Sequence, residues 1–254
     1  MSTAQIDPRP LALVTGGMHR IGAAIAARLA DAGYDLALHC RTHNQPDAAL
    51  AAAIDHNGTA WQGFCADLSD DGAADDLYDA VVAHFGRAPR LLINNASLFS
   101  ESSATAADAR QLKQTMMVNL AAPIHLAKRM AQGGGAGCII NILDQRVCNP
   151  VPDQFDYSIT KQALWQATRT MALALAPNIR VNAVAPGLTL PTAEYTAEQM
   201  ARVAALMPLK RLPHPEDIAD AVLYLVNAHS VTGQTNFVDG GANLRSYERD
   251  FAYL

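Results

Sequence analysis

The segment LALVTGGMHRIG, residues 11–22, joins a short apolar run to a glycine-containing turn. The segment IGAAIAARLADAG, residues 21–33, follows with apolar residues on one helical face and a glycine at its end. A strand, a turn and a helix in this order are typical of a parallel sheet covered on both faces. Gly16 and Gly22 allow the backbone to approach a ligand closely, and the helix dipole favours a pyrophosphate there. Glycines also occur in such turns for packing alone, so the position at the first strand gives this turn its weight.

Five further apolar runs alternate with longer segments of helical period. They are DLALHC at 35–40, WQGFCA at 61–66, RLLINN at 90–95, GCIINIL at 137–143 and IRVNAVAP at 179–186. The alternation predicts an α/β fold, a single-domain doubly wound parallel sheet of the Rossmann type with helices on both faces. Ligands of such sheets bind beyond the carboxyl ends of the strands. The region 188–230 is predicted to form a loop, a short helix and a further helix but no strand, and we expect the loop and helix at about 188–210 to cover a substrate.

Composition narrows the class of protein. The chain has 254 residues, 50% hydrophobic and 17% charged, and a formal charge of −5. We expect one domain over residues 1–254 and, because no block of like charge is present, no nucleic-acid partner. No apolar run approaches the roughly 18 residues of a membrane span and residues 1–10 lack a signal-peptide pattern, so we expect a cytoplasmic protein without membrane contact. The cysteines lack metal-ligand spacing, which predicts no metal site and free thiols at Cys40, Cys65, Cys138 and Cys148.

The end of the second apolar run favours one dinucleotide over another. The chain reads His39-Cys40-Arg41-Thr42-His43 there. An NAD site usually has a carboxylate at this place, which accepts hydrogen bonds from the ribose 2′-hydroxyl. No acid is present, whereas Arg41 and Thr42 can hold a 2′-phosphate through charge-assisted hydrogen bonds. We therefore expect NADPH as the cofactor. An arginine after a strand more often lies in solvent, so the missing acid is the stronger argument.

Polar residues also follow the third and fourth runs. Asp67-Leu68 comes after the third run, and Asn95-Ala96-Ser97 comes after the fourth. Because the carboxyl ends of parallel strands share one edge, we expect the first pair near the adenine ring and the second group along the cofactor groove. Asp67 could equally cap a helix.

Tyr157 and Lys161 lie four residues apart at the start of the helical pattern YSITKQALWQATRTMALALA. This spacing places both side chains on one helical face. A free phenol ionises near pH 10, and a neighbouring ammonium lowers that pKa, so Tyr157 could exchange protons near neutral pH. A tyrosine and a lysine at this spacing are more often surface residues than catalytic ones. Other motifs in the sequence are therefore needed to identify the pair as catalytic.

The motifs together resemble those of the short-chain dehydrogenase/reductase family over nearly the entire chain. They are the Thr15-Gly16 to Gly22 turn, Asn94-Asn95-Ala96, Asn119, Tyr157-x3-Lys161 and Pro186-Gly187. The resemblance implies that Tyr157 donates a proton, that Lys161 binds the nicotinamide ribose and tunes Tyr157, and that Asn119 holds a water of the proton relay. It also implies cofactor contacts for Gly16, His19, Arg20, Ile21, Gly22, Pro186 and Gly187, and a substrate contact for Leu188.

Two positions depart from the family pattern. Asp144 stands thirteen residues before Tyr157, where the family carries a serine, and Arg20 replaces the middle glycine of the turn. Both departures resemble the pteridine reductases and the bacterial dihydromonapterin reductases, as does the segment Asn95-Ala96-Ser97-Leu98-Phe99. That resemblance implies that Phe99 stacks on a pterin, while Ser97 and Arg20 contact the cofactor phosphates or the pterin edge.

The substitution of Asp144 for serine suits reduction of a ring C=N bond. The nitrogen needs a proton, which a carboxyl group linked to Tyr157 or to water can relay. The sequence therefore indicates an NADPH-dependent reductase of a dihydropterin, with dihydromonapterin, dihydrobiopterin and dihydrofolate as candidate substrates. Asp144 could instead pair with Arg146 or cap backbone amides, and Phe99 could be a core residue.

Two other functions stay open. One is reduction of a ketone, such as a 3-oxoacyl thioester or a sugar-like carbonyl, by NADPH. The other is a non-catalytic dinucleotide sensor, against which Tyr157, Lys161 and Asn119 argue.

Assembly is the last expectation. The resemblance implies a homotetramer that packs the catalytic helix and the last strand region against partners, and Leu164, Trp165 and Ala167 fit such a face. Burial within one subunit is the alternative. We expect the aromatic tail residues Tyr247, Phe251 and Tyr253 to fold over a neighbour's site.

Overall fold

The computed structural model describes residues 9–191 and 195–253. Residues 1–8 lie outside the described residues. They form most of the N-terminal segment that is expected to lack a signal peptide. Part of the segment predicted to cover the substrate, residues 192–194, also lies outside the described residues. No helix in the described ranges has the length and apolar character needed to cross a membrane.

Seven parallel strands form one sheet in the order β3-β2-β1-β4-β5-β6-β7. Their bounds are β1 Leu11–Val14, β2 Asp35–Cys40, β3 Trp61–Cys65, β4 Leu91–Asn94, β5 Gly137–Ile142, β6 Ile179–Pro186 and β7 Thr235–Val238. The predicted Rossmann-type sheet is confirmed, with the strand order reversing at β1. The six apolar runs form β1 to β6, and β7 is a seventh strand at the edge. Its sequence TNFV is half-buried throughout, which explains why it lacks a fully apolar run.

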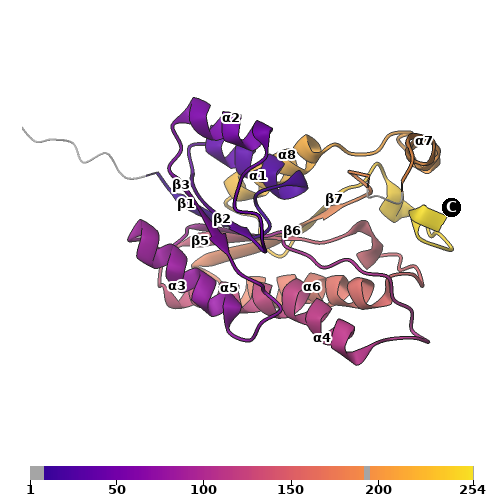
Figure 1. The fold of residues 1–254 in the computed structure, drawn as a ribbon, viewed down its shortest axis with the longest axis horizontal. Coiled ribbons are helices and arrows are strands. Elements are labelled where there is room, and N and C mark those ends of the chain that lie inside the picture. Colours follow the sequence, from indigo (N-terminus) through magenta and orange to yellow (C-terminus); the bar gives the residue numbers. More distant parts are fainter. Residues whose placement is uncertain (1–8, 192–194, 254) are drawn as a thin grey trace, which may run out of the picture.

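Helices cover both faces of the sheet (Figure 1). One face carries α1 Arg20–Asp31, α2 Ala48–Asn57 and α8 Pro215–Asn227. The other carries α3 Ala73–Phe85, α4 Ala109–Met116, α5 Ala122–Gln132 and α6 Phe155–Ala174. Alternate residues of β1 supply the two cores: Ala12 and Val14 pack with α1 and α8, and Leu11 and Leu13 pack with α3 and α5. This alternation follows from the two-residue period of a strand.

A buried chain of hydrogen bonds fixes α6 against the sheet. The Asn94 amide donates to Asn141 Oδ1 at 2.8 Å, and the Asn141 amide donates to Thr168 Oγ1 at 2.9 Å. All three side chains are buried. Because Tyr157, Lys161, Leu164 and Thr168 recur at helical spacing, the same rotation of α6 that brings Thr168 to the sheet directs the first turns inward.

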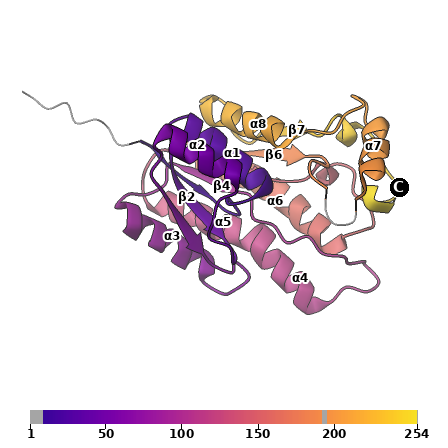
Figure 2. The same ribbon diagram turned by 45° about the horizontal axis from the view of Figure 1, so that its top comes forward.

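The segment after β6 and the C-terminal tail meet beyond the carboxyl ends of the strands (Figure 2). There α7 Ala197–Leu206 and the tail form a small apolar cluster that includes Val203, Met207, Ala242 and Phe251. The predicted loop and short helix between the sixth strand and α8 are present, with α7 as the helix.

The residues proposed for subunit contacts differ in burial. Leu164 lies in the core of its own chain, with Leu143, Val147 and Ala183, and is 1% exposed. Its apolar character therefore has an explanation within one subunit. Trp165 and Ala167 remain partly exposed. The homotetramer stays a prediction.

Candidate active site

A groove runs along the first β–α turn and the ends of β2 and β4. Its lining includes most of the residues predicted to hold the cofactor: Gly16, His19, Arg20, Ile21, Gly22, Arg41, Thr42, Asn95, Ala96 and Ser97. Arg41 and Thr42 are exposed at the end of β2. Among the residues that the structure describes, no Asp or Glu lines this groove.

Close backbone contact shapes the turn. A Cβ atom added at Gly22 would lie 2.0 Å from Gly16 O, so only glycine fits there without rearrangement. The Asn95 amide donates to Thr15 O at 2.9 Å and to Gly16 O at 3.0 Å, which ties the turn to the end of β4. Arg20 has a left-handed φ of 58°, a backbone conformation that favours glycine. An arginine therefore keeps the conformation expected of the glycine that it replaces.

His39 is a groove residue that sequence reasoning missed. It is buried, its Nδ1 atom accepts the Gly16 N–H at 3.1 Å, and its Nε2 atom lies 3.0 Å from Ala66 O. Burial lowers the pKa of His39, and this hydrogen-bond pattern assigns a neutral ring with the proton on Nε2. A histidine inside an otherwise apolar strand gave no separate signal for this role.

Asp67 and Leu68 are not among the groove-lining residues. Asp67 is nevertheless close enough to Arg41 and His39 for electrostatic interaction. Asp67 Oδ1 accepts from Ser69 N and Ser69 Oγ at 2.9 and 2.7 Å, and these bonds lower the pKa of Asp67. Asp67 therefore stabilises the turn before α3, and the helix-cap interpretation is wrong because Gly72 is the N-cap of that helix. Leu68 is 4% exposed and packs in the core beside α3.

Tyr157 and Lys161 lie together in the first turns of α6. The Tyr157 hydroxyl donates to Asp144 Oδ2 at 2.9 Å. Lys161 Nζ donates to Ile142 O at 2.8 Å and lies 5.7 Å from the centre of the Tyr157 ring. Both side chains are buried. The surface interpretation of this pair is therefore wrong.

The prediction that a neighbouring ammonium lowers the pKa of Tyr157 is wrong. Burial raises this pKa well above its usual value, and the Asp144 carboxylate raises it further. Burial also lowers the pKa of Lys161 to about 8, against the opposing effect of Asp144. Tyr157 is therefore protonated at neutral pH, as a proton donor must be.

Asn119 is buried in a π-helical turn, Met117–Ala121, between α4 and α5. Its amide nitrogen donates to Leu98 O at 3.0 Å and to Thr160 Oγ1 at 3.1 Å. Its oxygen accepts from Leu98 N at 2.7 Å and from Ser97 Oγ at 3.2 Å. The side chain therefore holds the segment after β4 against α6. π-turns of this kind are frequent at functional sites.

Asp144 makes the contacts expected of a structural partner of Arg146 and also those expected of a proton relay to Tyr157. Its Oδ1 atom accepts from Arg146 N at 2.8 Å and pairs with Arg146 Nε at 3.2 Å, while Oδ2 accepts from Tyr157. The carboxylate is thus tied to the scaffold through one oxygen and to the phenol through the other.

A second hollow of about 530 Å³ adjoins the groove at Arg20 and Ile21, which line both. Phe99 is 46% exposed beside it, so the core interpretation of Phe99 is wrong. The Phe99 ring meets the Tyr157 ring edge-on at 4.8 Å between centres. The lining also includes Asp144, Gln145, Arg146, Gly187, Leu188, Tyr195, Asp250 and Phe251. Aromatic, apolar and charged side chains therefore line the hollow together.

Two further predicted residues form the rim of the sheet. Pro186 ends β6 and is buried, and Gly187 follows it at the hollow. A Cβ at Gly187 would lie 2.8 Å from the Cα of Asp239, which requires glycine. Within residues 9–191 and 195–253, His, Cys, Asp and Glu side chains form no group of three or more suited to a metal ion.

The tail closes the hollow of its own chain. Phe251 and Asp250 line it, and Tyr247 packs against Phe251 with ring centres 4.9 Å apart. That the aromatic tail also reaches a neighbouring subunit's site stays a prediction. Sequence order could not show which site the tail reaches, because its contacts depend on how residues about a hundred positions apart fold together, such as Arg249 and Asp153.

Fold and site together define an oxidoreductase that uses a nicotinamide cofactor: a dinucleotide groove on a Rossmann-type sheet leads to a buried Tyr–Lys pair. The chain belongs to the short-chain dehydrogenase/reductase family. A family model described as enoyl-(acyl carrier protein) reductase matches residues 16–243.

Individual relatives cover nearly the whole chain. FolM alternative dihydrofolate reductase 1 from Brucella canis, solved in complex with NADP, is 39% identical, with a TM-score of 0.85 over 93% of this chain and 95% of that one. Pteridine reductase 1 from Leishmania tarentolae is 30% identical over 92% of this chain and 96% of its own length. LugOII, a promiscuous reductase that catalyses keto-reduction at C1 in lugdunomycin biosynthesis, is 32% identical, with a TM-score of 0.83 over 93% and 98%.

Proposed function

We propose that this chain is an NADPH-dependent reductase that converts a dihydropterin to the tetrahydropterin. Dihydromonapterin, dihydrobiopterin and dihydrofolate are the candidate substrates. One observation carries the proposal: the Asp144 carboxylate accepts a hydrogen bond from the Tyr157 hydroxyl. Both side chains line a hollow that is also bordered by the exposed Phe99 ring. The likeness to FolM and to pteridine reductase 1 supports it.

The reaction adds a hydride to carbon and a proton to nitrogen of a C=N bond. NADPH supplies the hydride when it is bound. Tyr157 holds its proton at neutral pH and lines the hollow, so it would give this proton to the nitrogen of a substrate bound there. Asp144, hydrogen-bonded to Tyr157, passes a proton from pocket water to replace the one lost. Lys161 orients the nicotinamide ribose, and Asn119 holds the Ser97–Phe99 segment in place.

The remaining contacts concern binding. Phe99 offers a ring face to the heterocycle, and Leu188 supplies an apolar wall. Arg20 reaches both the groove and the hollow, so its guanidinium can meet the cofactor phosphates or the pterin edge. Ser97 lines the groove beside it.

Ketone reduction is the second candidate function. It is favoured by the ion pair between Asp144 and Arg146, which a purely structural aspartate would also make, and by the likeness to LugOII. In that case Tyr157 would protonate a carbonyl oxygen and Asp144 would only hold Arg146.

A substrate panel tests the two functions against each other. NADPH oxidation is followed with dihydromonapterin, dihydrobiopterin, dihydrofolate and a 3-oxoacyl thioester under one set of conditions. The proposal expects the highest kcat/KM with a dihydropterin. A kcat/KM that is highest with the thioester would replace it by the ketone reductase, and cofactor binding without any turnover would favour a dinucleotide sensor.

The choice of NADPH over NADH is expected to depend on Arg41. Arg41→Ala removes the cation that faces the groove at the end of β2, so KM for NADPH should rise about tenfold to a hundredfold. KM for NADH should stay within about twofold, because NADH lacks the 2′-phosphate. Steady-state kinetics with both cofactors measure this. Arg90→Ala, at the opposite end of the sheet, is the control. Equal losses with both cofactors would show that Arg41 does not bind the 2′-phosphate.

A further inference from the structure

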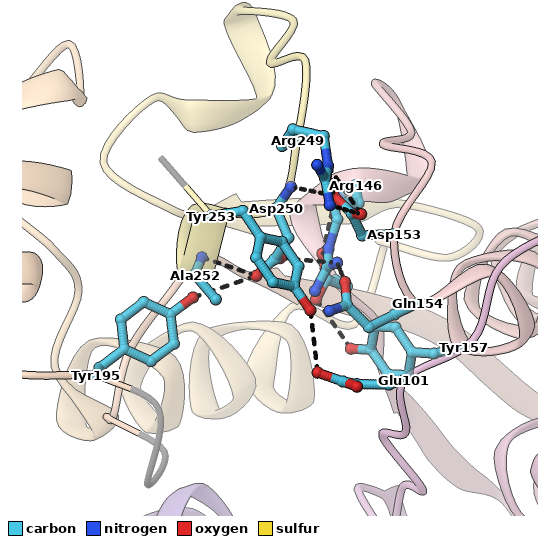
Figure 3. A network of polar contacts seen from close by, with 11 residues as sticks. Glu101, Arg146, Asp153, Gln154, Tyr157, Tyr195, Arg249, Asp250, Ala252 and Tyr253 are labelled. Atoms are coloured by element: carbon cyan, nitrogen blue, oxygen red, sulfur yellow. Dashed lines mark hydrogen bonds and ion pairs between the residues drawn. The ribbon is translucent and has the colours of Figure 1, made fainter.

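Arg146 is a buried cation held between two carboxylates from distant parts of the chain. Its Nε atom pairs with Asp144 Oδ1 at 3.2 Å. Its Nη1 atom pairs with Asp250 Oδ2 at 3.0 Å, and Figure 3 shows Asp250 beside Arg146. Its guanidinium also lies over the Phe99 and Tyr157 rings, 5.4 Å from each centre. Burial opposes the charge, but the carboxylates and Tyr157 outweigh it, so the pKa of Arg146 is raised and the side chain stays charged.

Gln154 contributes the third contact of this cation. Its Oε1 atom accepts from Arg146 Nη1 at 2.9 Å, and the side chain is 2% exposed. The Gln154 backbone has a left-handed φ of 47°, which is strained for a residue other than glycine. Because Gln154 directly precedes α6, the contact with Arg146 fixes the start of the helix that carries Tyr157.

The tail that carries Asp250 is anchored on both sides. Arg249 forms a bidentate ion pair with Asp153, and Asp250 N donates to Asp153 Oδ2 at 2.7 Å. The Tyr253 hydroxyl donates to Glu101 Oε1 at 3.1 Å, as Figure 3 shows. These contacts hold the tail over the hollow and present the carboxylate to Arg146.

Both oxygens of Asp250 already have partners. Oδ1 accepts from Ala252 N at 2.9 Å and from the Tyr195 hydroxyl at 3.3 Å, and Oδ2 pairs with Arg146. Asp250 is 6% exposed, and its carboxylate has few lone pairs left to accept a hydrogen bond from a substrate. Asp250 therefore acts on the reaction chiefly through its ion pair with Arg146, with a smaller direct electrostatic effect on Tyr157.

The charge balance gives Asp250 that effect. Two carboxylates share one guanidinium, so Asp144 keeps Oδ2 for Tyr157. Without the charge of Asp250, Asp144 would be the one carboxylate paired with Arg146 among the described residues. A buried cation with a single anion attracts that anion more strongly. The guanidinium would then compete with Tyr157 for the Asp144 carboxylate.

We propose that Asp250 in the C-terminal tail is a positioning residue for the proton-delivering pair Asp144–Tyr157 and that it acts through Arg146. The inference rests on the proposed function insofar as this pair delivers the proton. The tail thereby completes the site electrostatically as well as covering the hollow.

The groups that face Tyr157 set the expected direction of its titration. Asp144 and Arg146 face it from the turn after β5, Lys161 from α6, and Asp250 from the tail. Asp144 and Asp250 raise the pKa of Tyr157, whereas Arg146 lowers it. Removing the negative charge of Asp250 leaves Arg146 less compensated, so the pKa of Tyr157 must fall.

The test compares Asp250→Asn with Asp250→Glu, which keeps the charge. Asp250→Asn should lower kcat about threefold to thirtyfold at neutral pH. It should also move the high-pH loss of kcat toward lower pH, by about one pH unit or less. Asp250→Glu should restore most of kcat and of the pH profile. Asp79→Asn, which removes an exposed carboxylate paired with Arg129, is the matched control and should change neither.

Ultraviolet titration of tyrosine gives a readout independent of turnover. The difference between each protein and its Tyr157→Phe counterpart isolates the ionisation of Tyr157, which should occur at lower pH in Asp250→Asn. An unshifted ionisation and pH profile, with only a lower Tm, would reduce Asp250 to a structural contact and overturn the proposal. The kinetic arm uses whichever substrate of the panel the unmodified chain reduces, so failure of the pterin assignment and failure of this inference give different results.

A double-mutant cycle tests the route through Arg146. In an Arg146→Met background, Asp250→Asn should shift the Tyr157 titration much less than in the unmodified protein, because only the direct electrostatic effect of Asp250 remains. A shift of the same size in both backgrounds would show that Asp250 acts directly and would contradict the route. If Arg146→Met does not fold, the Asn and Glu variants of Asp250 still decide the proposal.

Discussion

Tyr157→Phe is expected to lower kcat for the reduced substrate by about a hundredfold to ten-thousandfold, the usual contribution of a positioned proton donor. The substitution removes one hydroxyl and keeps the ring that packs against Phe99. The hydroxyl is the group that Asp144 holds at 2.9 Å at the hollow, and its raised pKa keeps it protonated at neutral pH. Steady-state kcat and single-turnover rates of NADPH oxidation measure the loss.

Cofactor binding should be nearly unchanged in Tyr157→Phe. The groove lining includes the glycine turn and the ends of β2 and β4 but not Tyr157, so Kd for NADPH, followed by its fluorescence, should stay within about threefold. Tyr224→Phe, at an exposed position on α8, serves as the control for the chemical change. A Tyr157→Phe protein that keeps more than a third of kcat would assign the proton to Asp144 or to water.

The sheet could be predicted because burial on both faces leaves a continuous apolar signal in the sequence. β1 is flanked by helices on either side and reads LALV, with all four residues fully buried. β7 closes the edge and reads TNFV, so its pattern does not separate it from a loop. The glycine turn could be predicted as well, because close backbone packing there leaves room only for glycine. A Cβ at Gly22 would lie 2.0 Å from Gly16 O.

The charge network of the site could not be predicted from local pattern. The sequence indicates Arg146 only as a partner of the nearby Asp144, because nothing near it in sequence points to Asp250, more than a hundred positions away. The same limit explains the error about Tyr157. The spacing to Lys161 suggested a lowered pKa, whereas burial and Asp144 raise it. Helical spacing places two side chains on one face, but the depth of burial depends on the whole fold.

Asp144→Ser is expected to reverse the preference among substrates. Serine restores the hydroxyl that the family pattern carries at this position and removes the carboxylate that accepts from Tyr157. For a dihydropterin, kcat/KM should fall about a hundredfold to a thousandfold, because no acidic group then replaces the Tyr157 proton. Reduction of the 3-oxoacyl thioester should rise above the rate of the unmodified protein, since a serine hydroxyl can polarise a carbonyl. NADPH oxidation with both substrates measures the change.

The fold should survive Asp144→Ser, and the reason lies in the tail. Arg146 would keep Asp250 at 3.0 Å and Gln154 at 2.9 Å, so the buried cation would still have an anionic partner. Loss of pterin turnover could then be assigned to chemistry, provided that Tm falls no further than in an Asp144→Asn control. Asp144→Asn keeps the shape of the side chain without its charge and should lose pterin turnover with no gain on the thioester. If Asp144→Ser reduced the dihydropterin within about threefold of the unmodified rate, Asp144 would be a scaffold residue and the pterin assignment would lose its chemical basis.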